Sequence, residues 1–198
     1  QALLMRDSAR AEGVMAGDAA LDQLEREIEA AAIELLATRQ PVAVDLRGVV
    51  AALKIAKDLE RIGDHAKSVA RRGAALAGLS QLPALNGVER LGSRVHANLR
   101  LAMGALRSSD AAAAREAWAA DEPVDDIYNG LVRELLTHMM EDPRGIGAGT
   151  QLLFAAKSLE RIGDHATNIA ELVHYAELGA QLPPDRPRGE DGAASVVA

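Results

Sequence analysis

One eight-residue segment occurs twice in this chain, and this repeat constrains the fold more than any other feature. Residues 59–66 read Leu-Glu-Arg-Ile-Gly-Asp-His-Ala, and residues 159–166 repeat that sequence without a change. Upstream aspartates recur at an offset of 103 residues: Asp7, Asp18 and Asp22 match Asp110, Asp121 and Asp125. A repeat of this length indicates a tandem duplication of one supersecondary unit. The two halves are predicted to meet near residues 79–85.

The composition favours an all-α fold and excludes several classes of function. Aromatic residues make up 2% of the 198 residues, too few for an all-β fold, which packs with aromatic and β-branched side chains. Cysteine is absent, which excludes disulfides, cysteine zinc sites, iron–sulfur clusters and thiol nucleophiles. The net charge of −7 argues against sequence-independent nucleic-acid binding. No apolar run approaches the roughly 18 residues of a membrane span.

Each half is predicted to be helical. In the first half, Asp7 caps a helix that runs to about residue 39, Pro41 ends it, and a second helix runs from Asp45 to about residue 78. Residues 2–5 are interpreted as the end of a helix whose beginning is missing, so the chain is expected to be a fragment.

The second half is predicted to contain three helices. They cover residues 87–107, residues 110–140 with a kink at Pro123, and residues 148–179. The predicted architecture is therefore a tandem duplication of antiparallel three-helix bundles, with the first helix of the N-terminal bundle mostly missing. The predicted domains are residues 1–79 and 80–180, followed by a disordered tail at 181–198.

Four pairs of acidic residues stand out, each with a spacing of four residues. They are Asp18 with Asp22, Glu60 with Asp64, Asp121 with Asp125, and Glu160 with Asp164. Residues four apart lie on one face of a helix. In an antiparallel hairpin, residues equidistant from the turn face each other. The midpoint of positions 18 and 64 is 41, and that of positions 121 and 164 is 142.5, so each midpoint falls in a predicted turn.

The four carboxylates of each hairpin are therefore predicted to lie at one level, where they repel each other. A hard cation would relieve this repulsion, because carboxylate oxygens bind Mg²⁺, Mn²⁺, Ca²⁺ or iron. Gly63 and Gly163 lie between the acids and leave room for an ion. The sequence thus predicts two metal sites, the first formed by Asp18, Asp22, Glu60 and Asp64 and the second by Asp121, Asp125, Glu160 and Asp164.

Neighbouring residues receive structural roles. His65 and His165 are expected at an interhelix edge or in solvent, and Trp118 in the core. Arg61 and Arg161 are expected to point away from the acids. Lys57 and Lys157 lie one turn before the glutamates and could pair with them in the absence of metal. Asp58 and Asp126 lack an acidic counterpart in the other half and are interpreted as surface residues.

Residues 45–64, together with the repeat at 157–171, resemble the PhoU family of phosphate-signalling accessory proteins. The resemblance implies two three-helix bundles and metal sites of the Glu/Asp-x-x-x-Asp type on the eight acids named above, with iron or zinc as the ion. The carboxylate chemistry and the resemblance together predict iron, zinc, manganese or magnesium, with the identity left open. Ser68 departs from the family, which usually has asparagine there.

The resemblance also implies a function. A member of this family would be a cytoplasmic, homodimeric adaptor without enzymatic activity. It would negatively regulate the phosphate-starvation response by linking the ATPase of a phosphate ABC transporter to a membrane sensor histidine kinase, with no nucleic-acid partner.

Other functions fit less well. The main alternative is an all-helical metal-dependent phosphohydrolase, whose carboxylates hold two metals and activate water. Such enzymes use i,i+3 carboxylates and basic nucleotide contacts, whereas the spacing here is i,i+4 and no basic cluster is expected beside the acids. A ferritin-like di-iron oxidase needs Glu-x-x-His, whereas the repeated motif reads Glu-x-x-x-Asp-His. A histidine phosphocarrier fits poorly with two identical histidines that each follow an acid.

Overall fold

The computed structural model describes residues 1–76 and 84–183, and this part of the chain contains helices and no strands. The helices are α1 (Ala2–Met5), α2 (Ser8–Arg39), α3 (Val44–Ala75), α4 (Leu85–Ser108), α5 (Ala111–Ala119), α6 (Glu122–Glu141) and α7 (Ile146–Leu178), with a 3₁₀ turn at Pro143–Gly145. The all-α prediction is confirmed. Most of the predicted repeat boundary at 79–85 and most of the predicted tail lie outside the described residues.

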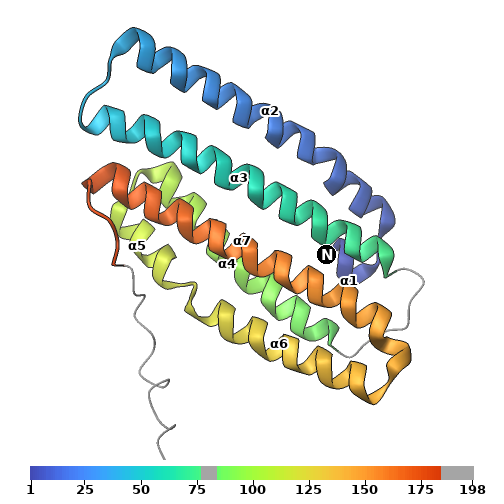
Figure 1. Ribbon diagram of the computed structural model, residues 1–198. Helices are drawn as coiled ribbons and strands as arrows, with labels where there is room; N and C mark the ends of the chain where they lie inside the picture. The colour runs from blue at the N-terminus through green and yellow to red at the C-terminus, as the bar shows by residue number, and fades with distance from the viewer. Residues whose placement is uncertain (77–83, 184–198) are drawn as a thin grey trace, which may run out of the picture.

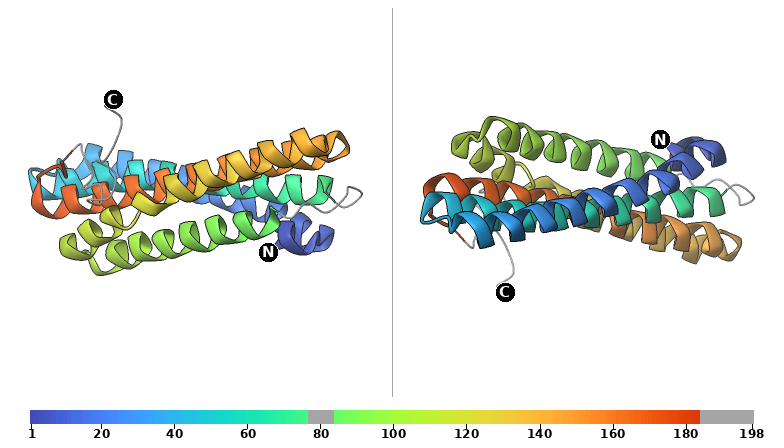
Figure 2. Two further views of the ribbon diagram at one scale, coloured as in Figure 1. Left: turned by 90° about the horizontal axis from the view of Figure 1, so that it is seen from below. Right: turned by 90° about the horizontal axis from the view of Figure 1, so that it is seen from above.

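The long helices run side by side. Figure 1 shows α2, α3 and α7 aligned along the long axis of the molecule, with α2 antiparallel to α3 and α6 antiparallel to α7. Figure 2 shows α4 on one face of this layer. None of the helices in the described part of the chain is long and apolar enough to cross a membrane.

Helix α7 is the centre of the fold, because it packs against α3, α4, α5 and α6. Two hydrophobic clusters lie along it. One includes Leu91, Leu135 and Leu152, and the other includes Trp118 and Ile169, all nearly inaccessible to solvent. Trp118 is therefore a core residue, as predicted.

Helix α2 lies at the edge of the molecule and packs mainly against α3. Over its whole length only three residues are buried, namely Ala11, Asp18 and Ala32. Large apolar side chains of this helix stay accessible, such as Leu24 (52% exposed) and Ile33 (58% exposed). The two halves thus differ in how much apolar surface their outer helices bury.

Several local predictions are confirmed. Asp7 caps α2 by accepting a hydrogen bond from the backbone N–H of Arg10, at 2.9 Å. Asp110 caps α5 through the N–H groups of Ala112 and Ala113. Gly179, with a φ of 70°, ends α7 in the left-handed conformation that glycine adopts without strain.

The predicted kink at Pro123 is wrong, because the helix is interrupted there. Helix α5 ends at Ala119, and Pro123 lies in the first turn of α6, where a proline is tolerated because no N–H is needed. The carbonyl oxygen of Ala120, at this break, accepts a hydrogen bond from Arg94 of α4. An α4 side chain thus satisfies a backbone acceptor at the end of α5.

Candidate functional site: two acidic clusters on helical hairpins

The predicted register of both hairpins is confirmed. A Cβ placed on Gly63 would lie 3.6 Å from Asp18 Oδ1, and one placed on Gly163 would lie 3.2 Å from Asp121 Oδ1. Each glycine of the repeated motif therefore lies directly against the first aspartate of the facing helix. We call the residues Asp18, Asp22, Glu60 and Asp64 the first acidic cluster, and Asp121, Asp125, Glu160 and Asp164 the second acidic cluster.

The eight carboxylates differ in their exposure. Asp18 and Asp121 are buried, at 6% and 3% exposed. Glu60 and Glu160 are nearly buried, whereas Asp64 and Asp164 are about two-fifths exposed. Asp22 is half-buried and Asp125 is exposed. Each cluster thus has an inner aspartate and glutamate, with more accessible aspartates around them.

Lysine ammonium groups neutralise part of both clusters. Lys57 Nζ lies 3.0 Å from Glu60, and Lys157 Nζ lies 2.7 Å from Glu160. These pairs are the ones expected for a cluster without a bound metal. Lys57 also reaches Glu25 of α2 at 3.2 Å, and these two hydrogen bonds raise the pKa of its ammonium group.

The first acidic cluster contains a further cation that the sequence analysis missed. Lys67 of α3 pairs with the buried carboxylate of Asp18. This hydrogen bond, together with the nearby charges of Asp64 and Asp22, raises the pKa of Lys67. Position 67 aligns with position 167 at the offset of 100, where the chain has threonine. This lysine-to-threonine difference is the signal in the sequence that could have revealed it.

The second acidic cluster has a different inner partner. Asn98 of α4, 3% exposed, donates a hydrogen bond from Nδ2 to Asp121 Oδ1 at 3.2 Å. Its Oδ1 atom is buried without a hydrogen-bond partner. The sequence analysis missed Asn98 because it lies outside the repeated hairpin, on the additional helix of the second half.

In the second acidic cluster, the pKa of the Asp164 carboxyl is raised. Burial, and the charges of Glu160, Asp121 and Asp125, raise the pKa of this carboxyl, although Arg161 opposes the shift. The second acidic cluster therefore brings its carboxylates close enough to interact.

The prediction that Arg61 and Arg161 point away from the acids is wrong. Arg61 Nη1 lies 3.1 Å from Asp64, and Arg161 Nη1 lies 3.5 Å from Asp164. Together with the lysines, these guanidinium groups form basic borders beside the acids, so the expectation of no basic cluster there is also wrong. Each arginine reaches the acid three residues later in the chain, because positions i and i+3 are neighbours on a helix surface.

The two histidines meet at the α3–α7 interface. The rings of His65 and His165 stack with their centroids 5.6 Å apart. Of the two expected positions, an interhelix edge or solvent, the histidines occupy the first. Burial and the neighbouring His165 lower the pKa of His65. Asp58 was interpreted as a surface residue, but it lies at this interface. Its Oδ1 atom is 2.7 Å from His165 Nδ1 and accepts a hydrogen bond from Asn168 Nδ2 at 3.4 Å. Ser158 and Ser68 join the same helices through their hydroxyl groups, 3.2 Å apart.

The carboxylates of the two clusters are the kind of ligand that a hard cation prefers. Oε2 of Glu60 and of Glu160 is buried and accepts no hydrogen bond of good geometry, even though a lysine Nζ lies close by. However, among the described residues no three carboxylate or imidazole groups are arranged to hold one ion. Cation binding by these residues would therefore require carboxylates to turn from their lysine partners.

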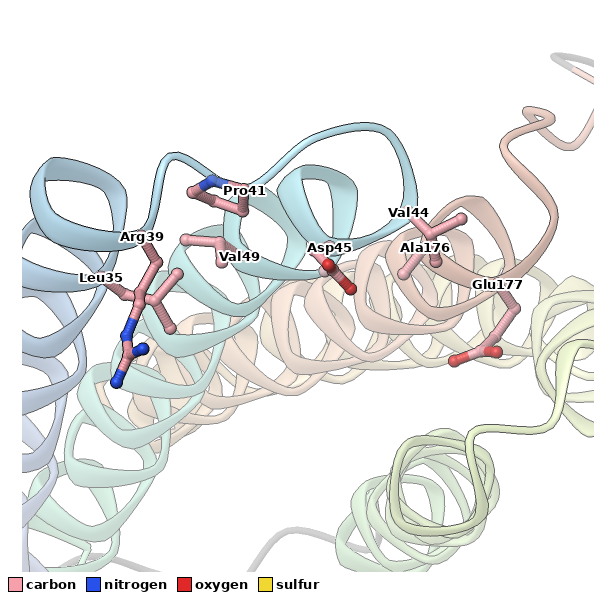
Figure 3. Close-up of a pocket in the computed structure, with 9 residues that line it drawn as sticks. Leu35, Arg39, Pro41, Val44, Asp45, Val49, Ala176 and Glu177 are labelled. Atoms are coloured by element: carbon pink, nitrogen blue, oxygen red, sulfur yellow. The ribbon is translucent and has the colours of Figure 1, made fainter.

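Two surface hollows lie elsewhere on the molecule. A hollow of about 540 Å³ lies at the α2–α3 turn beside the end of α7, and Figure 3 shows Arg39, Pro41, Asp45 and Glu177 among its lining residues. A larger hollow of about 790 Å³ lies between α3 and α7, beside Asp58 and Asn168. None of the eight predicted ligands lines either hollow.

Comparisons with known proteins agree with this architecture. A model of the PhoU domain matches residues 1–73 and 88–173. The chain is 50% identical, over 94% of its length and 82% of the relative's, to a phosphate-specific transport system accessory protein PhoU homolog of Caulobacter vibrioides. It is 45% identical to the Rhizobium meliloti homolog, over 96% of its length and 81% of the relative's.

Solved structures are similar over most of the chain. The crystal structure of PhoU from Pseudomonas aeruginosa is 43% identical, with a TM-score of 0.87, and covers 90% of this chain and 86% of that one. The phosphate transport system regulatory protein PhoU from Streptococcus pneumoniae is 30% identical, with a TM-score of 0.83 over 92% of this chain and 86% of that one.

Proposed function

Because this chain belongs to the PhoU family, we propose that it is a regulator of phosphate transport that represses the phosphate-starvation response. The observation that carries the proposal is that the likeness extends over both repeats, including both copies of the Glu-Arg-Ile-Gly-Asp motif. Relatives with this likeness bear names that link them to the phosphate-specific transport system.

In this proposal the protein acts as a cytoplasmic adaptor, without enzymatic activity, between the ATPase of a phosphate ABC transporter and a sensor histidine kinase. Long helices whose two hollows are open surface depressions in the described part of the chain suit binding to other proteins better than turnover of a small substrate. The two surface hollows contain none of the paired carboxylates. The working form proposed is a homodimer.

The regulatory role is testable in a bacterium that lacks its own member of this family. With phosphate in excess, a reporter of the starvation response is expected to remain active in that strain. Expression of the chain should restore repression, and an affinity-tagged copy should retain the transporter ATPase from the same cells. A reporter that stays active despite normal levels of folded protein would contradict the proposal. Hydrolysis of pyrophosphate or nucleotides with Mg²⁺ or Mn²⁺ would instead favour the phosphohydrolase alternative.

We further propose that the two acidic clusters hold metal ions that stabilise the partner-binding form. Asp18, Asp22, Glu60 and Asp64 would supply the ligands of one site, and Asp121, Asp125, Glu160 and Asp164 those of the other. A bound iron, zinc, manganese or magnesium ion would offset the repulsion between these carboxylates. The buried Oε2 atoms of Glu60 and Glu160, which pair with lysine but accept no hydrogen bond of good geometry, support this role.

The metal role has its own test. Metal ions are expected to raise Tm, and a chelator should lower it again. Replacement of Asp18, Asp22, Glu60 and Asp64 by their amides should remove part of the bound metal measured by mass spectrometry. If chelation and the quadruple change leave both Tm and metal content as they were, the metal role is wrong, while the regulatory role can still stand.

A further inference from the structure

The hollow at the α2–α3 turn, which we call the turn hollow, has the features of a docking surface. It has a volume of about 540 Å³ and lies between the last turns of α2, the first turns of α3 and the end of α7. Most of its lining is apolar, namely Leu35, Pro41, Val44, Val49 and Ala176. Of these side chains, Leu35 is 40% and Val44 is 59% exposed. Exposed apolar side chains that gather in one place mark surfaces that bind another molecule.

The aligned turn of the second repeat is packed more tightly. Gly48 lines the turn hollow and is exposed, whereas Ala148, its counterpart at the offset of 100, is 3% exposed. A Cβ placed on Gly48 would meet no atom of another part of the molecule within 4 Å. One placed on Gly149, beside Ala148, would lie 2.7 Å from the side chain of Met139. The open space at Gly48 is therefore a property of the first repeat and not of the shared hairpin.

Three charged side chains surround the turn hollow. Arg39 is the last residue of α2, Asp45 lies in the first turn of α3, and Glu177 lies in the last turn of α7. Figure 3 shows Arg39 at one side and Glu177 at the other, with Asp45 between them in this view. Within the described part of the chain, none of these three side chains has an ion-pair or hydrogen-bond partner. The rim is thus basic on α2 and acidic on α3 and α7, and its charges are available to another molecule.

We propose that the turn hollow is the docking site for a segment of the transporter ATPase that carries apolar anchors between a basic and an acidic residue. The basic residue would face Asp45 and Glu177, and the acidic residue would face Arg39. This inference rests on the adaptor role proposed above. Apolar side chains that fill a pocket supply most of the binding energy at a protein interface. Complementary charges at its rim set the orientation and speed association.

Filling the turn hollow tests the proposal directly. The full chain is immobilised, and its binding of the purified transporter ATPase from the same bacterium is measured by biolayer interferometry. Gly48→Trp places a large side chain in the open space and should weaken binding by at least about tenfold. Gly13→Trp is the matched control, because Gly13 is also an exposed helical glycine with no neighbouring atom within 4 Å, and it should leave binding unchanged. Leu35→Ser with Val44→Ser replaces Gly48→Trp if the tryptophan variant unfolds.

Charge variants test the orientation of the bound segment. Asp45→Asn with Glu177→Gln should slow association severalfold and reduce its dependence on salt, because complementary rim charges act mainly on the association rate. Arg39→Gln should also slow association. Glu12→Gln with Glu89→Gln removes the same charge from exposed positions on α2 and α4 and should have little effect. An equal effect of this control pair would overturn the proposed rim contacts, because general charge would then explain the result.

The outcomes separate this inference from the adaptor role. If the wild type and every turn-hollow variant bind the ATPase equally, the docking site is wrong and the adaptor role stands. With ATPase binding unchanged, a lower mass of Gly48→Trp in light scattering would assign the turn hollow to a second copy of the chain. Faster protease cleavage within residues 184–198 of that variant would assign it to the chain's own C-terminal segment. Either result overturns the inference, and a wild type that binds no ATPase contradicts both proposals.

Discussion

The two repeats use the same motif on outer helices that are stabilised in different ways. In the first repeat, α2 is continuous from Ser8 to Arg39, buries few residues and is joined to α3 partly by ion pairs such as Lys67 with Asp18 and Lys57 with Glu25. In the second repeat, the facing helix is broken between α5 and α6, and both parts contribute to a hydrophobic core with α4 and α7.

This difference shows that one acidic motif can be accommodated by two kinds of surroundings. Charge from the chain itself compensates the inner aspartate of the first repeat. A neutral amide from another helix contacts the inner aspartate of the second, beside apolar side chains such as Val95 and Val124. Variants that affect only one kind of surroundings should therefore act very differently in the two repeats.

The largest contrast is expected for core truncation. Leu135→Ala in α6 removes a side chain that is completely buried and should lower the free energy of unfolding by about 2–5 kcal/mol. Ile28→Ala in α2, where the side chain is 37% exposed, should cost about 1 kcal/mol or less. Urea denaturation of both variants measures the two values. Similar losses would mean that α2 buries as much apolar surface as α6 does.

The next effect concerns the ion pair of the first repeat. In chelator-treated protein, Lys67→Met should lower Tm, because Asp18 would keep a buried charge without its partner. Adding Asp18→Asn to Lys67→Met should recover much of the lost stability. Thermal unfolding followed by circular dichroism measures both variants. Lys54→Met is the matched control, and a loss equal to that of Lys67→Met would argue against a specific pair.

Replacement of Asp164 should raise Tm, whereas replacement of Lys67 should lower it. Because the pKa of Asp164 is raised in the folded protein, the protonated carboxyl favours folding, and this contribution is lost as the pH rises through that pKa. In chelator-treated protein at pH 7, Asp164→Asn should therefore raise Tm modestly. The gain should disappear below the ordinary pKa of aspartate, where the carboxyl is neutral in both states.

Asp64, which aligns with Asp164 in the first repeat, provides the comparison for this test. Asp64 accepts a charge-assisted hydrogen bond from Arg61 at 3.1 Å, so Asp64→Asn should not produce the same gain at pH 7. Thermal scans from pH 3 to pH 8 distinguish the two. Parallel curves for the two variants would show that the repulsion at Asp164 is too weak to affect folding.

The smallest contrast is expected at the two motif glycines. Alanine in a helix interior is favoured over glycine by about 1 kcal/mol. In Gly63→Ala the new methyl group would meet the mobile end of Leu21, which can turn aside, so most of this gain should remain. In Gly163→Ala it would press on the buried, hydrogen-bonded Asp121 at 3.2 Å, so the gain should be smaller or reversed. Denaturation midpoints of the two variants provide the comparison.

The local sequence predicted the helices and their register well. The repeat, the caps at Asp7 and Asp110, and the turn at Pro41 each depend on nearby residues, and the distance from turn to acid then fixes which residues face each other. The hairpin register followed from counting alone. The effect of Pro123 was harder to predict, because a proline can either bend a helix or begin a new one. In the structure it begins a new helix, and Arg94 of α4 binds the backbone at the break.

The surroundings of the acids could not be predicted in the same way. Asn98 reaches Asp121 from a helix outside the hairpin, and nothing in the spacing of the acids points to it. Asp58 looked like a surface residue because position 158 is serine, yet its partner His165 lies 107 residues away. Lys67 was recognisable only by comparing the flanks of the motif, because its partner Asp18 is 49 residues away.

The contacts between α3 and α7 imply a local two-fold relation between the repeats. His65 stacks on its own counterpart, His165, so a pseudo-symmetry axis passes between the two rings. Around this axis the contacts are reciprocal: position 58 meets position 168, and position 158 meets position 68. Such a pattern is that of an isologous interface, the kind that joins two identical subunits. Within one chain the two sides of such an interface need not be identical, and here the pair Asp58–Asn168 stands opposite the pair Ser158–Ser68.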